Sequence, residues 1–242
     1  MAQVRFRDPA GSVRTGTWHD GVIEFGGTTY DLEAVDVLPP SDPSKIVCVG
    51  LNYANHAEEE GKDLPERPLL FWKTPNTVAS HGSTVTLPEG KEKVEHEVEL
   101  AVVIGEQCRN VAAEDADSVI AGYTCANDIS NRDDQREERN WVRGKAFDNA
   151  CPLGPVLAPP EDVPERADVE LRVNGEVRQS SNTAEFVFSV PELIEEVTRH
   201  ITLEEGDVLL TGTPAGVDTL ADGDHVEVEV EGVGTLEHTV AR

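Results

Sequence analysis

Two glutamates, Glu97 and Glu99, stand at the start of the segment HEVELAVVIG (96–105). In a β-strand, residues two apart point to the same side, so these carboxylates would lie next to each other and repel. The segment continues as LAVVI, which predicts a strand that enters the core, where an unpaired carboxylate is costly. A divalent cation would remove both problems, and without a nearby Cys or His cluster the oxygen ligands favour Mg²⁺, Mn²⁺ or Ca²⁺ over zinc. The alternative is a solvated acidic strand face.

A third carboxylate follows in CANDIS (125–130), where Asp128 stands at the end of a strand-like stretch. Asp128 could complete a cation site, or it could be a turn residue that caps the following segment. Arg132 and Gln135 come four and seven residues later, and on a helix they share one face. An arginine there could hold a substrate carboxylate through a bidentate pair. Alternatively, Arg132 belongs to the surface ion pairs of RDDQREER.

His56 and Glu59 have the spacing of an acid–base pair on one helical turn. The carboxylate would orient the imidazole and raise its basicity. The alternative is a wet helix face, since Glu59 lies within a run of three glutamates. Lys145, in RGKAF, is followed by apolar residues, which indicates a half-buried cation. The segment TGTPAGV (211–217) has small and hydroxyl residues that suit backbone contacts to a ligand, or simply a turn.

The elements that must position these residues fall into two predicted regions. Residues 1–43 read as short strands and predict a small N-terminal β region. The Pro- and Ser-rich stretch PPSDPSK (39–45) predicts the boundary, and residues 44–242 form the main domain.

Most predicted elements of the main domain are strands. Strands are expected at 46–50, 69–72, 96–105, 123–130 and 207–214, with a hairpin over 169–179 around Asn174-Gly175 and further strands from 225 onwards. Helical segments are expected at 52–61, 112–122, within 132–147, and after Ser189, which forms a capping box with Glu192. Because helices and strands do not alternate regularly, the pattern favours an α+β fold with a largely β core over a Rossmann or TIM architecture.

The chain is strongly acidic, with 47 Asp and Glu against 20 Lys and Arg and a net charge of −27. Such a surface repels nucleic acids and anionic membranes, so we expect neither as a partner. The acidic residues are spread along the chain, which leads to the hypothesis that this is a halophile's protein, soluble in molar salt. In so acidic a chain, a cluster of carboxylates is weak evidence of a site by itself.

The four cysteines are far apart and form no CxxC pair, which argues against a zinc site or a disulfide framework. The first residues, MAQVRFRDPAG, have no apolar core of a signal peptide, and no apolar run approaches the length of a membrane span. We therefore expect a cytoplasmic protein with reduced thiols.

Six segments, in this order, resemble conserved blocks of the fumarylacetoacetate hydrolase family. They are CVGLNYANHAEEEG, PLLFWKTPNT, HEVELAVVIG, AGYTCANDISNRDDQ, GKAFDNACPLGP and LLTGTPAGV. The blocks cover about residues 45–217, and the short N-terminal region is similar to that of bacterial and archaeal members. The large N-terminal domain of the animal enzymes is absent.

The resemblance implies a function for each candidate residue. It assigns a divalent metal, usually Mg²⁺ and sometimes Mn²⁺ or Ca²⁺, to three carboxylates: Glu97, Glu99 and Asp128. It assigns the catalytic pair, on a mobile segment that orders over substrate, to His56 and Glu59. It assigns substrate binding or stabilisation of an oxyanion to four residues: Arg132, Gln135, Lys145 and Thr213, with Lys145 acting as a catalytic cation. Glu95 is left as ordinary acidic surface.

The family also implies a rolled β-sandwich core, a homodimer, and an enolate of a 2-oxo acid as the shared intermediate. Our first expectation is hydrolysis of a C–C bond in an acylpyruvate- or fumarylpyruvate-like diketo acid. The alternatives are a 2-oxo diacid decarboxylase, a 2-hydroxyhepta-2,4-diene-1,7-dioate isomerase of aromatic catabolism, or a 2-keto-3-deoxy sugar acid dehydratase. A metal-stabilised binding protein is the alternative from another class, and it would have no need of His56 and Glu59.

Overall fold

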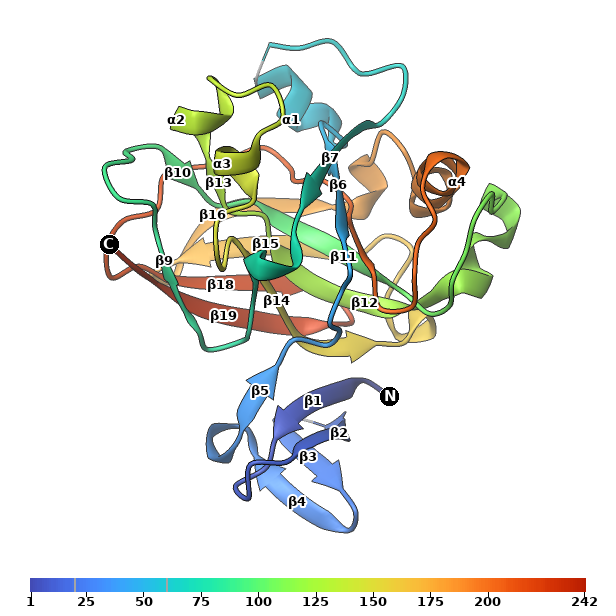
Figure 1. Cartoon of the computed structure of the whole chain (residues 1–242), viewed down its shortest axis with the longest axis vertical. Coiled ribbons are helices and arrows are strands. Elements are labelled where there is room, and N and C mark those ends of the chain that lie inside the picture. The colour runs from blue at the N-terminus through green and yellow to red at the C-terminus, as the bar shows by residue number, and fades with distance from the viewer. Residues whose placement is uncertain (20, 60) are drawn as a thin grey trace.

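The computed structural model describes residues 1–19, 21–59 and 61–242. Two sheets and a two-stranded ladder make up most of it (Figure 1). The 12-stranded sheet has the path β4-β3-β2-β1-β14-β12-β11-β17-β6-β7, with β5 on β1 and β8 on β14, and the five-stranded sheet has the order β16-β15-β18-β19-β9. Strands dominate, which confirms the predicted α+β fold with a largely β core.

The strands of the large sheet are β1 (Gln3–Arg7), β2 (Val13–His19), β3 (Val22–Phe25), β4 (Thr28–Asp31), β5 (Asp36–Leu38), β6 (Ile46–Gly50), β7 (Leu69–Lys73), β8 (Val78–Ala79), β11 (Val98–Ile104), β12 (Ile120–Asn127), β14 (Cys151–Ala158) and β17 (Val208–Leu210). Those of the smaller sheet are β9 (Thr84–Thr86), β15 (Asp168–Val173), β16 (Glu176–Asn182), β18 (His225–Val230) and β19 (Gly234–Ala241). The ladder pairs β10 (Val94–Glu95) with β13 (Ser130–Asn131).

Within the described residues the α-helices are α1 (Ala54–Glu59), α2 (Arg132–Gln135), α3 (Val142–Lys145) and α4 (Val190–His200). Short 3₁₀ helices cover Leu32–Ala34, Pro75–Thr77, Ala113–Val119, Pro160–Asp162 and Thr183–Glu185. No helix in this described part is long and apolar enough to cross a membrane. The four cysteines are buried free thiols.

Strands β1 to β5 form a small unit at the bottom of Figure 1, while α1, α2 and α3 lie at the top. The unit joins the main body where Gln3 of β1 pairs with Leu157 of β14. Its own apolar side chains, such as Phe6 and Ile23, are buried. The chemistry-bearing side chains come from the main body, and the division into domains 1–43 and 44–242 stays a prediction.

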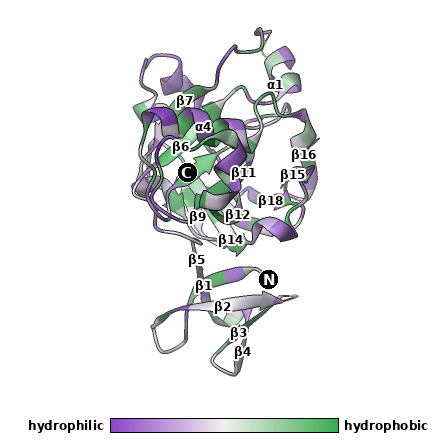
Figure 2. Ribbon diagram, turned by 90° about the vertical axis from the view of Figure 1, so that its right-hand side faces the viewer, coloured by the Kyte–Doolittle hydropathy of each residue, from purple (hydrophilic) through white to green (hydrophobic). Residues whose placement is uncertain are grey.

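Strand β11 lies between β12 and β17, so both of its edges are paired, and all of its residues are buried. Val98 and Leu100 pack into the core that also contains Leu171 and Val228 of the smaller sheet. Figure 2 shows these strands as the hydrophobic centre of the main body. Because side chains alternate along a strand, Glu97 and Glu99 point away from this sandwich core.

Two local signals in the sequence are confirmed. Asn174 and Gly175 both have positive φ, 53° and 79°, which is the turn that a tight hairpin requires, and β15 and β16 pair on either side of it. The capping box of Ser189 and Glu192 opens α4, whose apolar face is buried against the large sheet.

The helix expected at 112–122 is wrong. Residues Ala113–Val119 form a 3₁₀ helix, and Ile120 already begins β12, where it pairs with Ile104 of β11. The β-branched Val119 and Ile120 gain more from the sheet than from a helix, and the preceding Asp and Ser residues favour turns. The helix expected at 52–61 is shorter, Ala54–Glu59, and residue 60 lies outside the described part.

The parallel pairing of β6 with β17 depends on Asp207, which is fully buried just before β17. Its Oδ1 accepts hydrogen bonds from the backbone N–H groups of Ser44 and Lys45, both at 3.0 Å. Its Oδ2 accepts one from the Glu204 N–H at 2.7 Å and pairs with the Lys45 ammonium. One carboxylate therefore fixes the start of both strands.

We expect Asp207→Ala to lower the free energy of unfolding by about 3 kcal/mol, because it leaves buried donors and a lysine without a partner. Denaturant unfolding followed by circular dichroism measures this. The matched control is Glu205→Ala, an exposed acid in the same turn, which should change stability by less than about 0.5 kcal/mol. Equal losses in the two variants would contradict the assignment.

Candidate active site

The ends of two antiparallel strands bring the three predicted carboxylates together. Val98 pairs with Asn127, and the Asp128 N–H donates to the Glu97 carbonyl at 2.9 Å, so Asp128 lies across from Glu97. One oxygen each from Glu97, Glu99 and Asp128 lie within 4.8 Å of one another, and all three residues are buried. The acidic pair is not a wet strand face.

Lys145, at the end of α3, makes two of the closest contacts to this cluster. Its Nζ donates to Glu97 Oε2 at 2.8 Å and to Asp128 Oδ2 at 2.7 Å. The ammonium also lies 4.9 Å from the centre of the Phe71 ring. The side chain is almost fully buried, more than the half-buried cation that the sequence predicts.

A second buried cation, Lys73, was missed by sequence reasoning. Its Nζ donates to the carbonyls of Ile129, Lys145 and Ala150 at 3.1, 2.8 and 2.7 Å, and lies 2.8 Å from Asp128 Oδ1. An ammonium has only three protons, and the three carbonyls take them. Asp128 Oδ1 therefore receives charge but no aligned hydrogen bond, and it stays a buried acceptor with an open lone pair. The available signal was a lysine that directly follows an apolar strand.

Arg132 faces the same cluster from α2. Its Nε pairs with Glu95 Oε2 at 2.7 Å, its Nη2 pairs with Glu97, and its Nη1 donates to Gln135 Oε1 at 2.7 Å. The interpretation of Glu95 as ordinary surface is therefore wrong. The β10–β13 ladder pairs Glu95 with Ser130, two residues before Arg132, and this brings the ion pair into the site.

Positive charge is distributed unevenly over the carboxylates. Burial alone would raise the pKa of Glu97, but Arg132 and Lys145 outweigh it and lower that pKa below the ordinary value. Burial, reinforced by the charges of Asp128 and Glu97, raises the pKa of Glu99 well above its ordinary value. In the described part of the chain, Glu99 accepts one hydrogen bond, from the Gly212 N–H at 2.5 Å, and pairs with no Lys or Arg.

This arrangement fits a divalent cation. The donors are carboxylate oxygens only, which suits Mg²⁺, Mn²⁺ or Ca²⁺. Asp128 Oδ1 has a free lone pair, and among the described residues Glu99 forms no ion pair with a Lys or Arg. The chemistry of the donor set therefore agrees with the expected metal site.

The loop 211–217 connects the carboxylate cluster to α1. Gly212 donates to Glu99, and the Gly216 N–H contacts both oxygens of Glu59 at 3.2 Å. Both glycines have φ of +96°, and a Cβ at Gly216 would lie 2.4 Å from the Arg178 carbonyl oxygen. Glycine is required there, because other residues would be strained and would clash.

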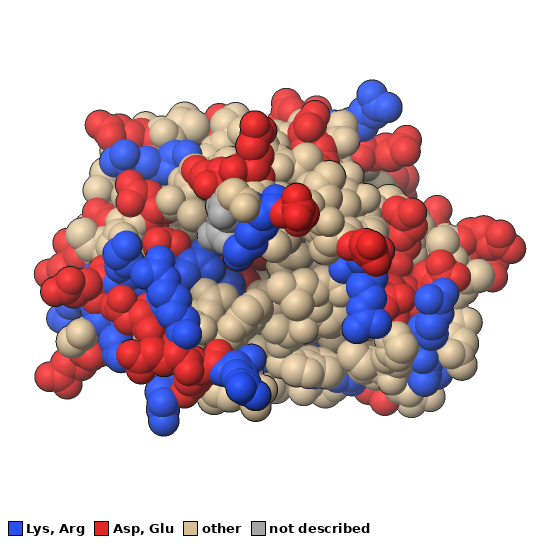
Figure 3. Space-filling model, turned by 90° about the horizontal axis from the view of Figure 1, so that it is seen from above, with Lys and Arg blue, Asp and Glu red and all other residues tan. Residues whose placement is uncertain are grey.

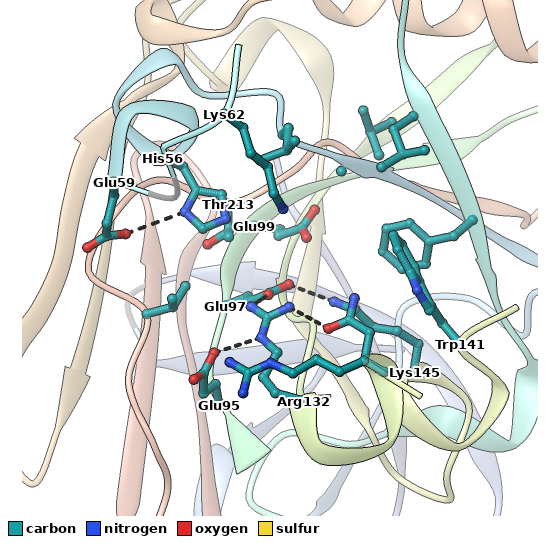
Figure 4. Close-up of a pocket in the computed structure, with 18 residues that line it drawn as sticks. His56, Glu59, Lys62, Glu95, Glu97, Glu99, Arg132, Trp141, Lys145 and Thr213 are labelled. Carbon is teal, nitrogen blue, oxygen red and sulfur yellow. Dashed lines mark hydrogen bonds and ion pairs between the residues drawn. The ribbon is translucent and has the colours of Figure 1, made fainter. Parts of the chain in front are cut away.

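His56 and Glu59 lie together on α1, as their spacing predicts. His56 Nδ1 is 3.5 Å from Glu59 Oε2, a distance at which the two groups interact electrostatically but do not complete an aligned hydrogen bond. His56 is only 5% exposed, so it is not an ordinary surface histidine. Figure 4 shows the pair on one wall of the site, with Trp141 on the opposite side.

The segment that leads into α1 is held by contacts with distant parts of the chain. The Asn52 side chain donates to the carbonyls of Phe188 and Thr211 at 3.0 and 2.8 Å. The Tyr53 ring packs edge-on against Phe186, with 4.8 Å between ring centres. These contacts hold the entry of α1 against β17 and the segment before α4.

A cavity of about 420 Å³ joins these groups. Its lining includes the sequence-predicted residues His56, Glu59, Glu97, Glu99, Arg132, Gln135, Lys145 and Thr213. Asp128 is not in the lining and sits fully buried behind it. Four of the 20 basic residues line this one cavity: Lys62, Arg132, Arg136 and Lys145. Figure 3 looks down on this end and shows Lys and Arg gathered in a group among the acids. The same cavity is also lined by four glutamates: Glu59, Glu95, Glu97 and Glu99.

Known proteins share both the sequence and the fold. The family model for the fumarylacetoacetate (FAA) hydrolase C-terminal domain matches residues 45–241. Oxaloacetate tautomerase YisK of Bacillus subtilis is 42% identical over 231 residues, which cover 90% of this chain and 77% of that protein.

Two solved structures extend the likeness over the whole chain. The 5-carboxymethyl-2-hydroxymuconate delta-isomerase of Mycobacterium smegmatis has a TM-score of 0.92 at 41% identity, covering 100% of this chain and 99% of that one. The fumarylacetoacetate hydrolase of Exiguobacterium antarcticum has a TM-score of 0.87 at 31% identity, covering 100% of both chains. With the family match spanning most of its length, this chain belongs to the fumarylacetoacetate hydrolase family.

Proposed function

We propose that this protein is a divalent-metal-dependent enzyme that moves a proton on a 2-oxo acid through its enolate, as a tautomerase or isomerase. The observation that carries the proposal is the pairing, across one cavity, of a buried histidine–glutamate couple with a buried carboxylate triad. A binding protein has no need of the histidine–glutamate couple. An enolate requires a positive charge, and the carboxylate triad can hold a cation that supplies it. The relatives named as a tautomerase and an isomerase, at 42% and 41% identity, support proton transfer over C–C hydrolysis.

The metal would be held by Glu97, Glu99 and Asp128, with Mg²⁺ as our first choice and Mn²⁺ or Ca²⁺ as alternatives. When bound there, a divalent cation supplies Lewis-acid stabilisation to the enolate form of the substrate.

The chain's own residues would do the rest. Arg132, Gln135 and Thr213 line the cavity with donors that suit a substrate carboxylate. The Lys145 ammonium adds positive charge where an oxyanion develops. His56, oriented by Glu59, accepts and returns the proton at carbon.

Hydrolysis of a C–C bond in an acylpyruvate is the second candidate. The same histidine could activate a water, and the relative from Exiguobacterium antarcticum is named as a hydrolase at 31% identity. Decarboxylation and dehydration use the same enolate and stay open. The homodimer, the cytoplasmic location and the halophilic origin also stay predictions.

A substrate panel separates these activities. With Mg²⁺ added, we expect the protein to speed interconversion of enol and keto oxaloacetate, followed by ultraviolet absorbance, by about 10²-fold or more. Acetylpyruvate, fumarylpyruvate and 2-keto-3-deoxy sugar acids should stay intact, and EDTA should abolish the activity. Cleavage of an acylpyruvate without tautomerase activity would favour hydrolysis, and no turnover of any 2-oxo acid would contradict the proposal.

Replacing Glu97 or Glu99 by a neutral glutamine should change the stability of the metal-free protein in opposite directions. Without metal, and at a pH above the raised pKa of Glu99, Glu99→Gln should raise the melting temperature. The Glu99 carboxylate then repels its neighbours and, among the described residues, forms no ion pair with a Lys or Arg, while Gln keeps the acceptor for Gly212. Glu97→Gln should cost about 2 kcal/mol, because Arg132 and Lys145 lose a charged partner. Both variants should lose Mg²⁺ affinity at least about 100-fold in calorimetric titration.

The control for this pair is Glu89→Ala, which changes an exposed acid outside both the cluster and the cavity lining and should change neither quantity. A metal-free Glu99→Gln protein less stable than the parent would show that Glu99 has a positive partner in solution.

His56→Ala should keep Mg²⁺ affinity and lose turnover by about 10²- to 10⁴-fold, because it removes the group that carries the proton. Steady-state kinetics and calorimetry on the same preparation measure both. His200→Ala, which changes an exposed histidine at the end of α4, should leave kcat unchanged. Full activity of His56→Ala would remove the histidine from the mechanism.

A further inference from the structure

Gln179 of β16 lies behind the cavity wall, 1% exposed, and does not line the cavity. Its Oε1 accepts a hydrogen bond from the Val98 N–H at 3.0 Å and lies 3.0 Å from His96 Nδ1. Its Nε2 donates to Pro214 O at 2.9 Å and to Thr213 Oγ1 at 2.8 Å. Both ends of one buried amide are therefore fully used.

The orientation of this amide is fixed by the backbone. The Val98 N–H can only donate and the Pro214 carbonyl can only accept, so the amide oxygen must face Val98 and its nitrogen must face Pro214. A flipped amide would place its N–H₂ group against the Val98 N–H and its oxygen against the Pro214 carbonyl oxygen. The Nε2 group is thus always a donor toward Thr213.

This donor decides what Thr213 offers to a ligand. The hydroxyl has one hydrogen, and its oxygen already accepts from Gln179. Among the described residues, no acceptor takes the hydroxyl hydrogen, and Thr213 lines the cavity. The hydrogen is therefore available to an acceptor inside the cavity.

Gln179 also sets where that hydroxyl lies relative to the carboxylate cluster. Val98 stands between Glu97 and Glu99, so one amide connects the backbone between the two carboxylates to the loop that carries Thr213. The connection is direct, although these residues are far apart in the sequence.

We propose that Gln179 is a positioning residue that acts through Thr213, fixing its hydroxyl as a donor to a carboxylate or enolate oxygen of the ligand beside the metal-binding carboxylates. The identity of that ligand as a 2-oxo acid rests on the proposed function. A bridge that merely stabilises the fold would lower stability without acting through Thr213, and this difference can be measured.

The test is a double-mutant cycle on binding of oxalate, a planar dianion, to the Mg²⁺-loaded protein by calorimetry. Thr213→Val removes the hydroxyl at constant shape, and Gln179→Met removes the amide at similar length. Each should weaken oxalate binding roughly 10-fold, because a hydrogen bond to a charged group is lost or misplaced. In the Thr213→Val background, Gln179→Met should weaken oxalate binding by less than about a further 2-fold, because the hydroxyl through which Gln179 acts is already absent.

Three results would overturn the inference: independent, multiplying losses in the double variant, unchanged oxalate affinity in Thr213→Val, or no oxalate binding by the parent. Mg²⁺ affinity should stay within about 2-fold in both single variants, and a parallel loss of Mg²⁺ would place the effect on the carboxylates instead. Gln107→Met, which changes an exposed glutamine, is the matched control and should bind oxalate like the parent.

Two further variants keep the test decisive if Gln179→Met does not fold. Thr213→Ser retains a hydroxyl and should restore most of the affinity lost in Thr213→Val. Gln179→Glu keeps the acceptor for Val98 but presents an oxygen to Thr213, so it should weaken oxalate at least as much as Gln179→Met. Unchanged affinity in Gln179→Glu would overturn the proposal. Because oxalate binding is read without turnover, an enzyme inactive on every 2-oxo acid would refute the proposed function while this cycle still reports on Gln179.

Discussion

Burying three carboxylates within 4.8 Å of one another is the constraint on which the arrangement of this site depends. Like charges in a region of low dielectric repel strongly, and each needs a positive partner. The chain supplies Lys73 from the end of β7, Lys145 from α3 and Arg132 from α2. Three elements that are separate in the sequence are thereby fixed around the ends of β11 and β12.

The compensation is incomplete in an informative way. Asp128 faces two ammonium groups and Glu97 faces an arginine and a lysine, whereas the one hydrogen bond to Glu99 from a described residue comes from a backbone N–H. The side of the cluster that lacks positive charge is therefore the side of Glu99. Glu97 and Glu99 both line the cavity, so the cavity reaches this side. A cation that enters from the cavity would supply positive charge beside Glu99, while Lys73 would remain the partner of Asp128, the third proposed ligand.

The acidic surface makes the four Lys and Arg residues of the cavity lining more important. A net charge of −27 repels an anionic substrate at long range in dilute salt. At about 1 M salt the screening length falls to about 3 Å, so only groups in contact with the substrate still act on it. At such a salt concentration, recognition would depend on donors that packing places inside the cavity, and not on long-range attraction.

Local signals were sufficient for part of this structure, and tertiary contacts decided the rest. The hairpin at Asn174 and the capping box at Ser189 follow from a few adjacent residues, and the order of six short blocks anticipated which side chains meet in the cavity. Gln179 and Glu95 could not be assigned this way, because each acts on partners tens of residues away and carries no characteristic spacing. Lys73 offered only its place at the end of an apolar strand. The segment 112–122 misled for the same reason, since pairing of Ile120 with Ile104 overrides local helix propensity.

The loop 211–217 shows why such distant partners matter for chemistry. Gly212 contacts Glu99, Gly216 contacts Glu59, and between them Thr213 and Pro214 accept from Gln179. A few consecutive residues therefore touch the carboxylate cluster, the partner of the histidine and the amide behind the wall. Moving this backbone would alter the distance between the proton-carrying group and the charge-stabilising group at once. The proposed enolate chemistry requires both groups at defined places around one substrate. For that chemistry, the glycines that allow the loop its shape would matter as much as the charged side chains.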